Sequence, residues 1–119
     1  MMEIERLNIW KLGVELAKDV YVLTEEFPKK EVYSLTGQIR RAAVSVPSNI
    51  AEGKGRSSAK DFINFLSVAR GSLYELATQL YIAREIEYLS EEDFASLSNR
   101  IEDLSHKIIA MTKYLRSKK

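Results

Sequence analysis

Apolar residues recur at steps of three and four along almost the whole chain. Three uninterrupted runs show this spacing: Ile9, Leu12, Leu16, Val20, Leu23 and Phe27; Phe62, Leu66, Ala69, Leu73, Leu76, Leu80 and Ala83; and Phe94, Leu97, Ile101, Leu104, Ile108, Met111 and Leu115. Strands would alternate at every second residue, whereas this period is typical of helices in an antiparallel bundle. The pattern predicts one all-α domain over residues 1–119.

Residues that break or cap helices divide this pattern into four segments. They are Pro28, the Gly53–Gly55 segment, and the candidate N-cap serines Ser34, Ser57 or Ser58, and Ser90. Proline disfavours helical geometry in the residue before it, and glycine readily takes the left-handed angles that end a helix. We expect helices at roughly 8–26, 34–53, 59–88 and 91–116, joined by short connections into an up-down-up-down four-helix bundle.

The composition excludes several classes of function. The chain has no cysteine and a single histidine, so thiol catalysis, disulfides and a histidine metal cluster are ruled out. No apolar run is long enough to span a membrane, and the first residues do not resemble a signal peptide. We therefore expect a cytoplasmic protein without metal, cofactor or membrane partner.

Two of the predicted helices carry more apolar surface than a bundle core needs. The apolar arc of the helix at 34–53 covers roughly 200°, and the helix at 8–26 has a second stripe beside the first. Such surplus suggests an interface between copies of the chain, with these candidate residues: Trp10, Val14, Tyr21, Val44, Pro47 and Ala51. The alternative is a tightly wrapped bundle that encloses both faces. Pro47 also predicts a kink, or a break and restart, near Val46.

Positive charge is concentrated in two separate parts of the chain. Residues 36–70 hold six basic and two acidic side chains, and residues 104–119 hold five basic and none acidic. The cations of the last turns, Lys113, Arg116, Lys118 and Lys119, are explained by their favourable place at a helix C-terminus. The middle segment supplies the candidate nucleic-acid contacts, with ordinary solvated charge as the alternative: Arg40, Arg41, Lys54, Arg56, Lys60 and Arg70.

Some of these charges also have candidate partners within the chain. Arg40 or Arg41 is expected to pair with Glu75 or Glu52, within one chain or between chains, because an unpaired buried charge is costly. Gly71 stands in the middle of a predicted helix, where glycine costs about 1 kcal/mol against alanine. We therefore expect a close backbone approach at Gly71.

A possible catalytic pair lies in the last helix. Arg100 precedes His106 by six positions, which resembles the catalytic motif of HEPN-type ribonucleases. Six residues of a helix place two side chains about 120° apart, so the pair would not share one face of a straight helix. We expect no enzymatic activity.

The segment QIRRAAVSVPSNIAEG at residues 38–53 carries a specific resemblance. With Ile9-Trp10-Lys11 and the stretch ARGSLYEL at 69–76, it resembles the four helix bundle protein family, also called the 23S rRNA intervening-sequence protein family. The family motif maps onto these residues: Gln38, Arg40, Arg41, Pro47, Ser48, Asn49, Glu52 and Gly53. The resemblance implies a small bacterial protein, a four-helix bundle, a homopentameric ring and no established activity.

Two functional hypotheses follow. The first is a ring-forming bundle without enzymatic activity that engages structured RNA or a nucleoprotein. The second is a structural oligomeric adaptor whose apolar groove takes a protein partner. The physiological role and the identity of any partner are not encoded in these patterns.

Overall fold

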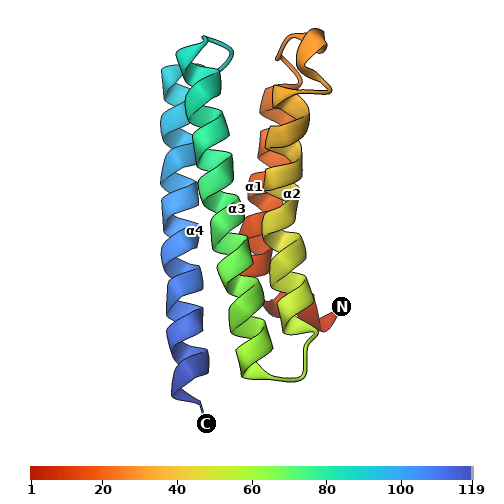
Figure 1. Ribbon diagram of the computed structural model, residues 1–119, viewed down its shortest axis with the longest axis vertical. Helices are drawn as coiled ribbons and strands as arrows, with labels where there is room; N and C mark the ends of the chain where they lie inside the picture. The colour runs from red at the N-terminus through yellow and green to blue at the C-terminus, as the bar shows by residue number, and fades with distance from the viewer. Residues whose placement is uncertain (119) are drawn as a thin grey trace.

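The computed structural model describes residues 1–118, which form four long helices. These are α1 (Asn8–Thr24), α2 (Leu35–Lys54), α3 (Ala59–Glu85) and α4 (Glu91–Ser117), with short 3-10 helices η1 at Glu3–Arg6 and η2 at Lys29–Glu31. Consecutive helices run in opposite directions along the 48 Å axis of the molecule (Figure 1). The predicted all-α four-helix bundle is confirmed, and residues 1–118 contain no strand.

Two of the three predicted serine caps are confirmed. Ser58 accepts a hydrogen bond from the Asp61 amide at 3.1 Å, and Ser90 accepts one from the Asp93 amide at 3.0 Å. Ser34 precedes α2, but its side chain does not cap that helix. Its hydroxyl instead donates to Glu31, whose carboxylate accepts the Leu35 amide at 3.4 Å. A glutamate from η2 therefore takes over the role predicted for Ser34.

The end of α3 differs from the prediction because one residue turns left-handed. Glu87 has φ of 67°, so the helix stops at Glu85 and does not reach residue 88. The Tyr88 amide donates to the Ala83 carbonyl at 2.8 Å, and the Glu87 amide donates to the Arg84 carbonyl at 3.0 Å. This is the Schellman arrangement, in which glycine usually occupies the left-handed position. At the end of α2, where glycine was expected to turn left-handed, Gly55 keeps φ of −77°.

Replacing Glu87 with glycine is expected to stabilise the protein. The left-handed conformation costs an L-residue roughly 1–2 kcal/mol, and glycine's extra freedom in the unfolded chain cancels part of that gain. We expect the free energy of unfolding to rise by about 1 kcal/mol, measured by urea denaturation. The same change at Glu85, inside α3, should lower stability by about 1 kcal/mol. A Glu87→Gly variant less stable than wild type would contradict this reading.

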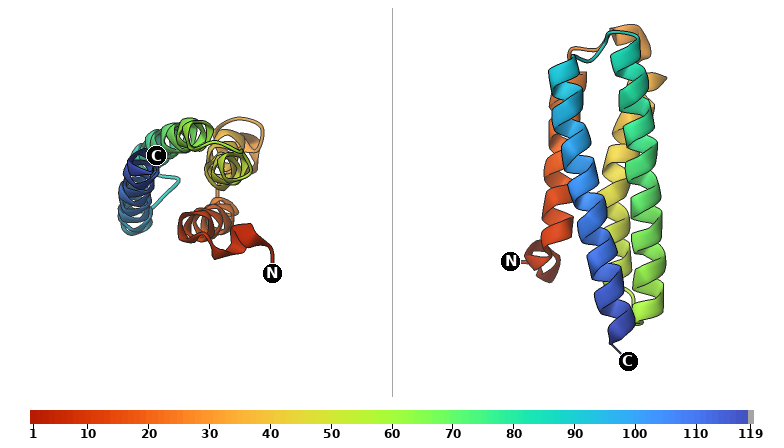
Figure 2. Two further views of the ribbon diagram at one scale, coloured as in Figure 1. Left: turned by 90° about the horizontal axis from the view of Figure 1, so that it is seen from below. Right: turned by 90° about the vertical axis from the view of Figure 1, so that its left-hand side faces the viewer.

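The predicted apolar stripes meet in one core. Val20, Ile39, Val46, Ile50 and Leu73 are among its fully buried side chains. Among helices that neighbour each other in the bundle, contact is most extensive between α2 and α3 and least between α1 and α4, which lie apart in the end-on view (Figure 2). Several members of the stripes on α1 and α4 are accordingly only half-buried: Leu12, Leu23, Phe94, Met111 and Leu115.

Pro47 does not interrupt α2. The helix is continuous from Leu35 to Lys54, so the predicted break and restart near Val46 is wrong. Pro47 is buried against α1, where a Cβ placed on Gly13 would lie only 3.3 Å from the Pro47 Cβ. The missing side chain of Gly13 lets the proline ring pack against the neighbouring helix. This packing offsets the cost of proline inside a helix.

Gly71 has no close neighbour. A Cβ added there would meet no atom within 4 Å, so the expected close approach does not occur within this chain. The residue is exposed on the outer side of α3. As for membranes, none of the helices described in residues 1–118 has the length and apolar character required to span one.

Candidate nucleic-acid and assembly surfaces

The six basic residues predicted to contact nucleic acid lie in different parts of the bundle. Arg40 lies beside α1, and Arg41 lines a polar hollow between α2 and α3. Lys54, Arg56 and Lys60 surround the connection between α2 and α3 at the opposite end of the molecule (Figure 1). Roughly 21 Å of helix separates Arg40 from Lys54 at 1.5 Å per residue. The six residues therefore do not form one patch.

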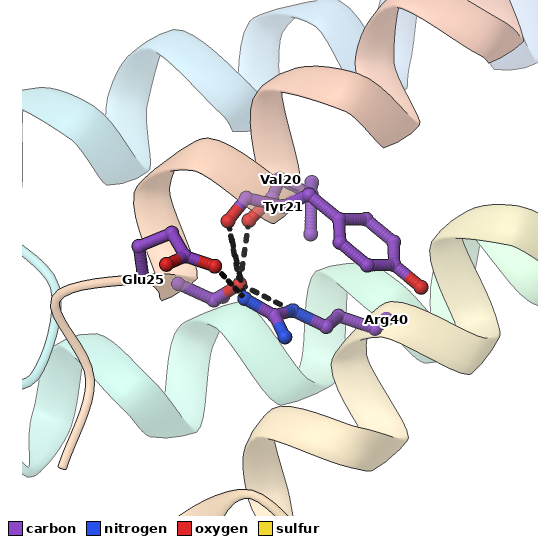
Figure 3. Close-up of polar contacts among 5 residues, drawn as sticks. Val20, Tyr21, Glu25 and Arg40 are labelled. Atoms are coloured by element: carbon purple, nitrogen blue, oxygen red, sulfur yellow. Dashed lines mark hydrogen bonds and ion pairs between the residues drawn. The ribbon is translucent and has the colours of Figure 1, made fainter. Parts of the chain in front are cut away.

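Arg40 holds the last turn of α1. Its Nε donates to Thr24 Oγ1 at 2.9 Å, and its Nη2 donates to the Tyr21 carbonyl and the Glu25 carboxylate, each at 3.2 Å (Figure 3). The guanidinium also lies 4.6 Å from the centre of the Tyr21 ring. Cations stabilise a helix C-terminus, where carbonyl groups lack intrahelical partners. Arg40 thus ties α2 to α1, and only 20% of its side chain is exposed.

The predicted partners of the two arginines are wrong within this chain. Arg40 pairs with Glu25, which sequence reasoning missed, and Glu52 pairs with Arg56 at 2.7 Å. Arg41 and Glu75 line the same polar hollow, but neither forms an ion pair within residues 1–118. A pairing of Arg41 or Glu75 between chains stays a prediction.

Of the polar residues in the α2 segment, Ser45 bonds to α3 and Asn49 bonds back within α2. Ser45 shares a 2.8 Å hydrogen bond with the buried Ser72. Asn49 donates to the Ser45 carbonyl at 2.8 Å and to its hydroxyl at 2.9 Å. Pro47 has no N–H to donate to the Ala43 carbonyl. The Asn49 side-chain amide bonds to the Ser45 carbonyl, two residues after Ala43. Gln38 lines the polar hollow with Arg41, while Ser48 is exposed.

Gly53, the last residue of the motif, lies at a close contact between α2 and α3. A Cβ built on it would lie 2.8 Å from the Phe65 Cβ and 2.9 Å from the Phe62 Cδ1. Real Cβ atoms do not approach other atoms this closely, so only glycine fits without movement. The close approach expected at Gly71 is found at Gly53.

Charge is segregated along the length of the bundle. Near one end, residues 1–11, 52–61 and 106–118 hold nine basic and four acidic side chains. Near the other end, residues 25–31 and 84–93 hold three basic and eight acidic side chains. Each group combines segments that are distant in sequence and that the antiparallel helices bring together (Figure 1). Folding therefore creates the basic surface that no single segment provides.

The acidic end is closed by a bond between its two turns. The Tyr88 hydroxyl donates to Glu31 at 2.9 Å and thereby links the α3–α4 turn to η2. Tyr88 also packs against Phe27, with ring centres 5.6 Å apart. Hydrogen bonds from the Ser34 and Tyr88 hydroxyls hold the pKa of the Glu31 carboxyl below its usual value of 4.5. The same bond raises the pKa of Tyr88.

This link predicts a pH-dependent loss of stability. Because the pKa of Glu31 is lowered by folding, its contribution is present above about pH 4.5 and is lost as pH falls through the folded value. Tyr88→Phe should be less stable than wild type at pH 7, and the difference should shrink below pH 4. Urea unfolding at several pH values measures this. Tyr81→Phe, which removes a half-exposed hydroxyl, is the control and should show no such convergence.

An apolar groove runs between α1 and α2. Its lining consists of Val14, Ala17, Lys18, Tyr21, Val22, Val44 and Pro47. Tyr21, Val22 and Val44 are exposed by 43%, 67% and 41%, respectively. Four predicted interface residues therefore share this groove, whereas Trp10 packs against the core and Ala51 is half-buried outside it. Sequence reasoning missed Val22, although it stands outside the core spacing of α1.

The structure gives the possible catalytic pair no shared site. Arg100 bonds to Asp19 of α1 at 2.7 Å and lines a small hollow between α1 and α4. His106 is exposed and does not line that hollow. Within residues 1–118, no three acidic or histidine side chains are grouped to hold a metal ion.

Comparison with known proteins gives one family and one fold. The model of the family described as 23S rRNA-intervening sequence protein matches residues 5–110. A solved structure from Bacteroides thetaiotaomicron, described as a protein of unknown function from the S23 ribosomal protein family, superimposes with a TM-score of 0.79. It is 24% identical, and the match covers 88% of this chain and 98% of that one. No curated protein matches the sequence.

Proposed function

Because the chain belongs to the 23S rRNA-intervening sequence protein family, we propose that it is a non-enzymatic bundle that assembles with copies of itself and binds structured RNA. The observation that carries this proposal is the segregation of charge. Nine basic and four acidic side chains lie near one end of a molecule whose total net charge is only +1. RNA phosphates would meet that end, while the acidic end would face away from them.

Assembly strengthens this electrostatic argument. Binding to phosphates releases counterions, and each contact adds to the affinity. A single basic end offers few contacts, but copies held side by side present it several times to one RNA molecule. In a closed ring of like-oriented bundles all basic ends point to the same side. Five copies, the number implied by the family resemblance, would be recognised from the mass of the assembly.

The apolar groove between α1 and α2 supports self-association. Isolated exposed apolar residues are normal, but here Val14, Tyr21, Val22 and Val44 adjoin one another in one depression. Lys18 is the one charged residue in its lining. In a ring, such a surface is covered by a different surface of the next copy.

The RNA proposal is tested with charge reversal at the basic end. Arg56→Glu with Lys60→Glu should weaken binding of a labelled RNA hairpin by about tenfold or more in low salt. Both side chains are exposed, so the fold should persist. The matched control is Lys29→Glu with Lys30→Glu at the acidic end, which should have little effect. Wild-type protein that retains no RNA at 50 mM salt would refute the proposal.

The same groove favours a second candidate, an adaptor that takes a protein partner. Apolar contacts depend little on salt, whereas phosphate contacts weaken steeply as salt rises. Partner capture that persists in high salt, from protein free of nucleic acid, would favour the adaptor. RNA that co-elutes in low salt and is lost in high salt would favour the first proposal.

A further inference from the structure

A second basic feature lies between the first half of α3 and the last half of α4. Its polar lining consists of Ser67 and Arg70 from α3, and Thr112, Lys113 and Arg116 from α4. No acidic side chain lines this hollow. Arg70 belongs to the basic segment 36–70, and Lys113 and Arg116 belong to the basic segment 104–119. The antiparallel packing of α3 and α4 therefore brings the two basic segments together here.

We propose that this hollow binds phosphate groups of the RNA strand, which places the RNA along the α3–α4 face and not only at the α2–α3 connection. The inference rests on the proposed function and specifies its site. Lys113 and Arg116, which the helix dipole alone explained at the level of sequence, become phosphate ligands beside Arg70. The Ser67 and Thr112 hydroxyls add neutral donors to the same hollow.

The unpaired state of the three cations supports this assignment. Arg40, Arg56, Arg84 and Arg100 each form an ion pair with a carboxylate. Arg70, Lys113 and Arg116 form none with residues 1–118. Like charges gathered without a counter-charge repel one another, and a bound anion would relieve this repulsion.

Contacts within the chain restrict the Arg70 side chain before any phosphate binds. Its side chain is half-buried, with Nε 3.5 Å from the buried Ser105 hydroxyl and the guanidinium 5.9 Å from the Tyr74 ring centre. A guanidinium held in this way loses less freedom when it binds a phosphate. The Ser105 contact ties Arg70 to α4, and Arg70 lines the same hollow as Lys113 and Arg116.

The hollow also continues into the basic end. Lys60, Ile63, Ser67 and Arg70 follow one another at steps of three and four, so they share one side of α3. The ten steps from Lys60 to Arg70 cover about 15 Å of helix. Phosphates of one strand advance about 3.4 Å each along a DNA duplex axis and less along an A-form RNA duplex, so this length corresponds to at least about four of them. The geometry fits a strand and not only one isolated anion.

The test compares two double variants that lose the same charge. Lys113→Gln with Arg116→Gln alters the hollow, and Lys29→Gln with Lys30→Gln alters the acidic end. Binding of a fluorescent RNA hairpin is measured from 50 to 200 mM salt. We expect the hollow variant to reduce the slope of log affinity against log salt by about 2, and the control variant to leave it unchanged. Thermal melting without RNA should show that both variants remain folded at the temperature of the binding measurement.

Other outcomes separate this inference from the proposed function. If wild type binds RNA with a steep salt dependence and the hollow variant keeps the same slope, the inference fails and the proposed function stands. Equal losses in both variants would show an effect of net charge alone and would also overturn the inference. If wild type binds no RNA, both fail. If tripolyphosphate then raises the melting temperature of wild type but not of the hollow variant, the ligand is a small polyphosphate and not a strand.

Discussion

Replacing Gly53 with alanine is expected to lower the free energy of unfolding by about 2 kcal/mol. The new methyl group would lie 2.8 Å from the Phe65 Cβ, 2.9 Å from the Phe62 Cδ1 and 3.2 Å from the Phe62 carbonyl oxygen. Overpacking a buried contact costs up to about 3 kcal/mol, and the better helix propensity of alanine returns about 1 kcal/mol. Because one of these atoms is a backbone oxygen, which cannot rotate away as a side chain can, α2 and α3 must separate slightly. The contact between α2 and α3 is the most extensive between any two helices of the bundle.

Gly71→Ala is the matched control, with the opposite sign expected. Gly71 also lies within a long helix, but no atom surrounds the added methyl group within 4 Å. It should raise stability by about 1 kcal/mol. Thermal melting should show a fall of about 8 °C for Gly53→Ala and a rise of about 4 °C for Gly71→Ala. An unchanged melting temperature for Gly53→Ala would show that the two helices are less closely packed there.

The contrast between these glycines shows what a single sequence conveys about packing. Gly71 interrupts a helical pattern and predicts either a cost or a compensating contact, whereas Gly53 was expected to end its helix. Which of them is compensated depends on the relative position of α2 and α3, and periodicity does not specify this. The helices themselves were predictable, because steps of three and four and two of the serine caps are local signals. The end of α3 was not, because glutamate rarely adopts the left-handed conformation that Glu87 takes.

The candidate sites show the same division. The wheel positions of Val14, Tyr21, Val44 and Pro47 on two helices predicted an apolar surface, and these residues do line one groove. Arg40 was correctly expected to need a partner, but Glu25, the C-cap residue of α1, meets it only because α1 and α2 pack side by side. The basic surface could not be predicted without the tertiary structure. Arg70 and Lys113 are 43 positions apart in the sequence and come together only when α3 and α4 pack.

Val44→Lys is expected to weaken the association between copies of the chain by a factor of about 100 or more. Val44 lines the groove between α1 and α2, with Lys18 in the same lining. If the next copy covers this groove, a second ammonium there is buried without a counter-charge, which costs several kcal/mol. A loss of 3 kcal/mol corresponds to a roughly 150-fold weaker association. We chose lysine and not glutamate because a glutamate could pair with Lys18 and so conceal the effect.

The measurement is the mass of the assembly at micromolar concentration, by sedimentation or light scattering. Because Val44 is 41% exposed in the single chain, its substitution should leave the helical content and the fold of the protomer intact. The matched control is Ile86→Lys, a similar change at a residue that is 48% exposed beyond the end of α3 and outside the groove. Monomeric Val44→Lys beside an assembled wild type and control would place the interface at α1 and α2. A wild type that is itself monomeric would refute self-association. RNA binding would then depend on one basic end per molecule, and the salt dependence of the affinity would reflect only the phosphate contacts of that single end.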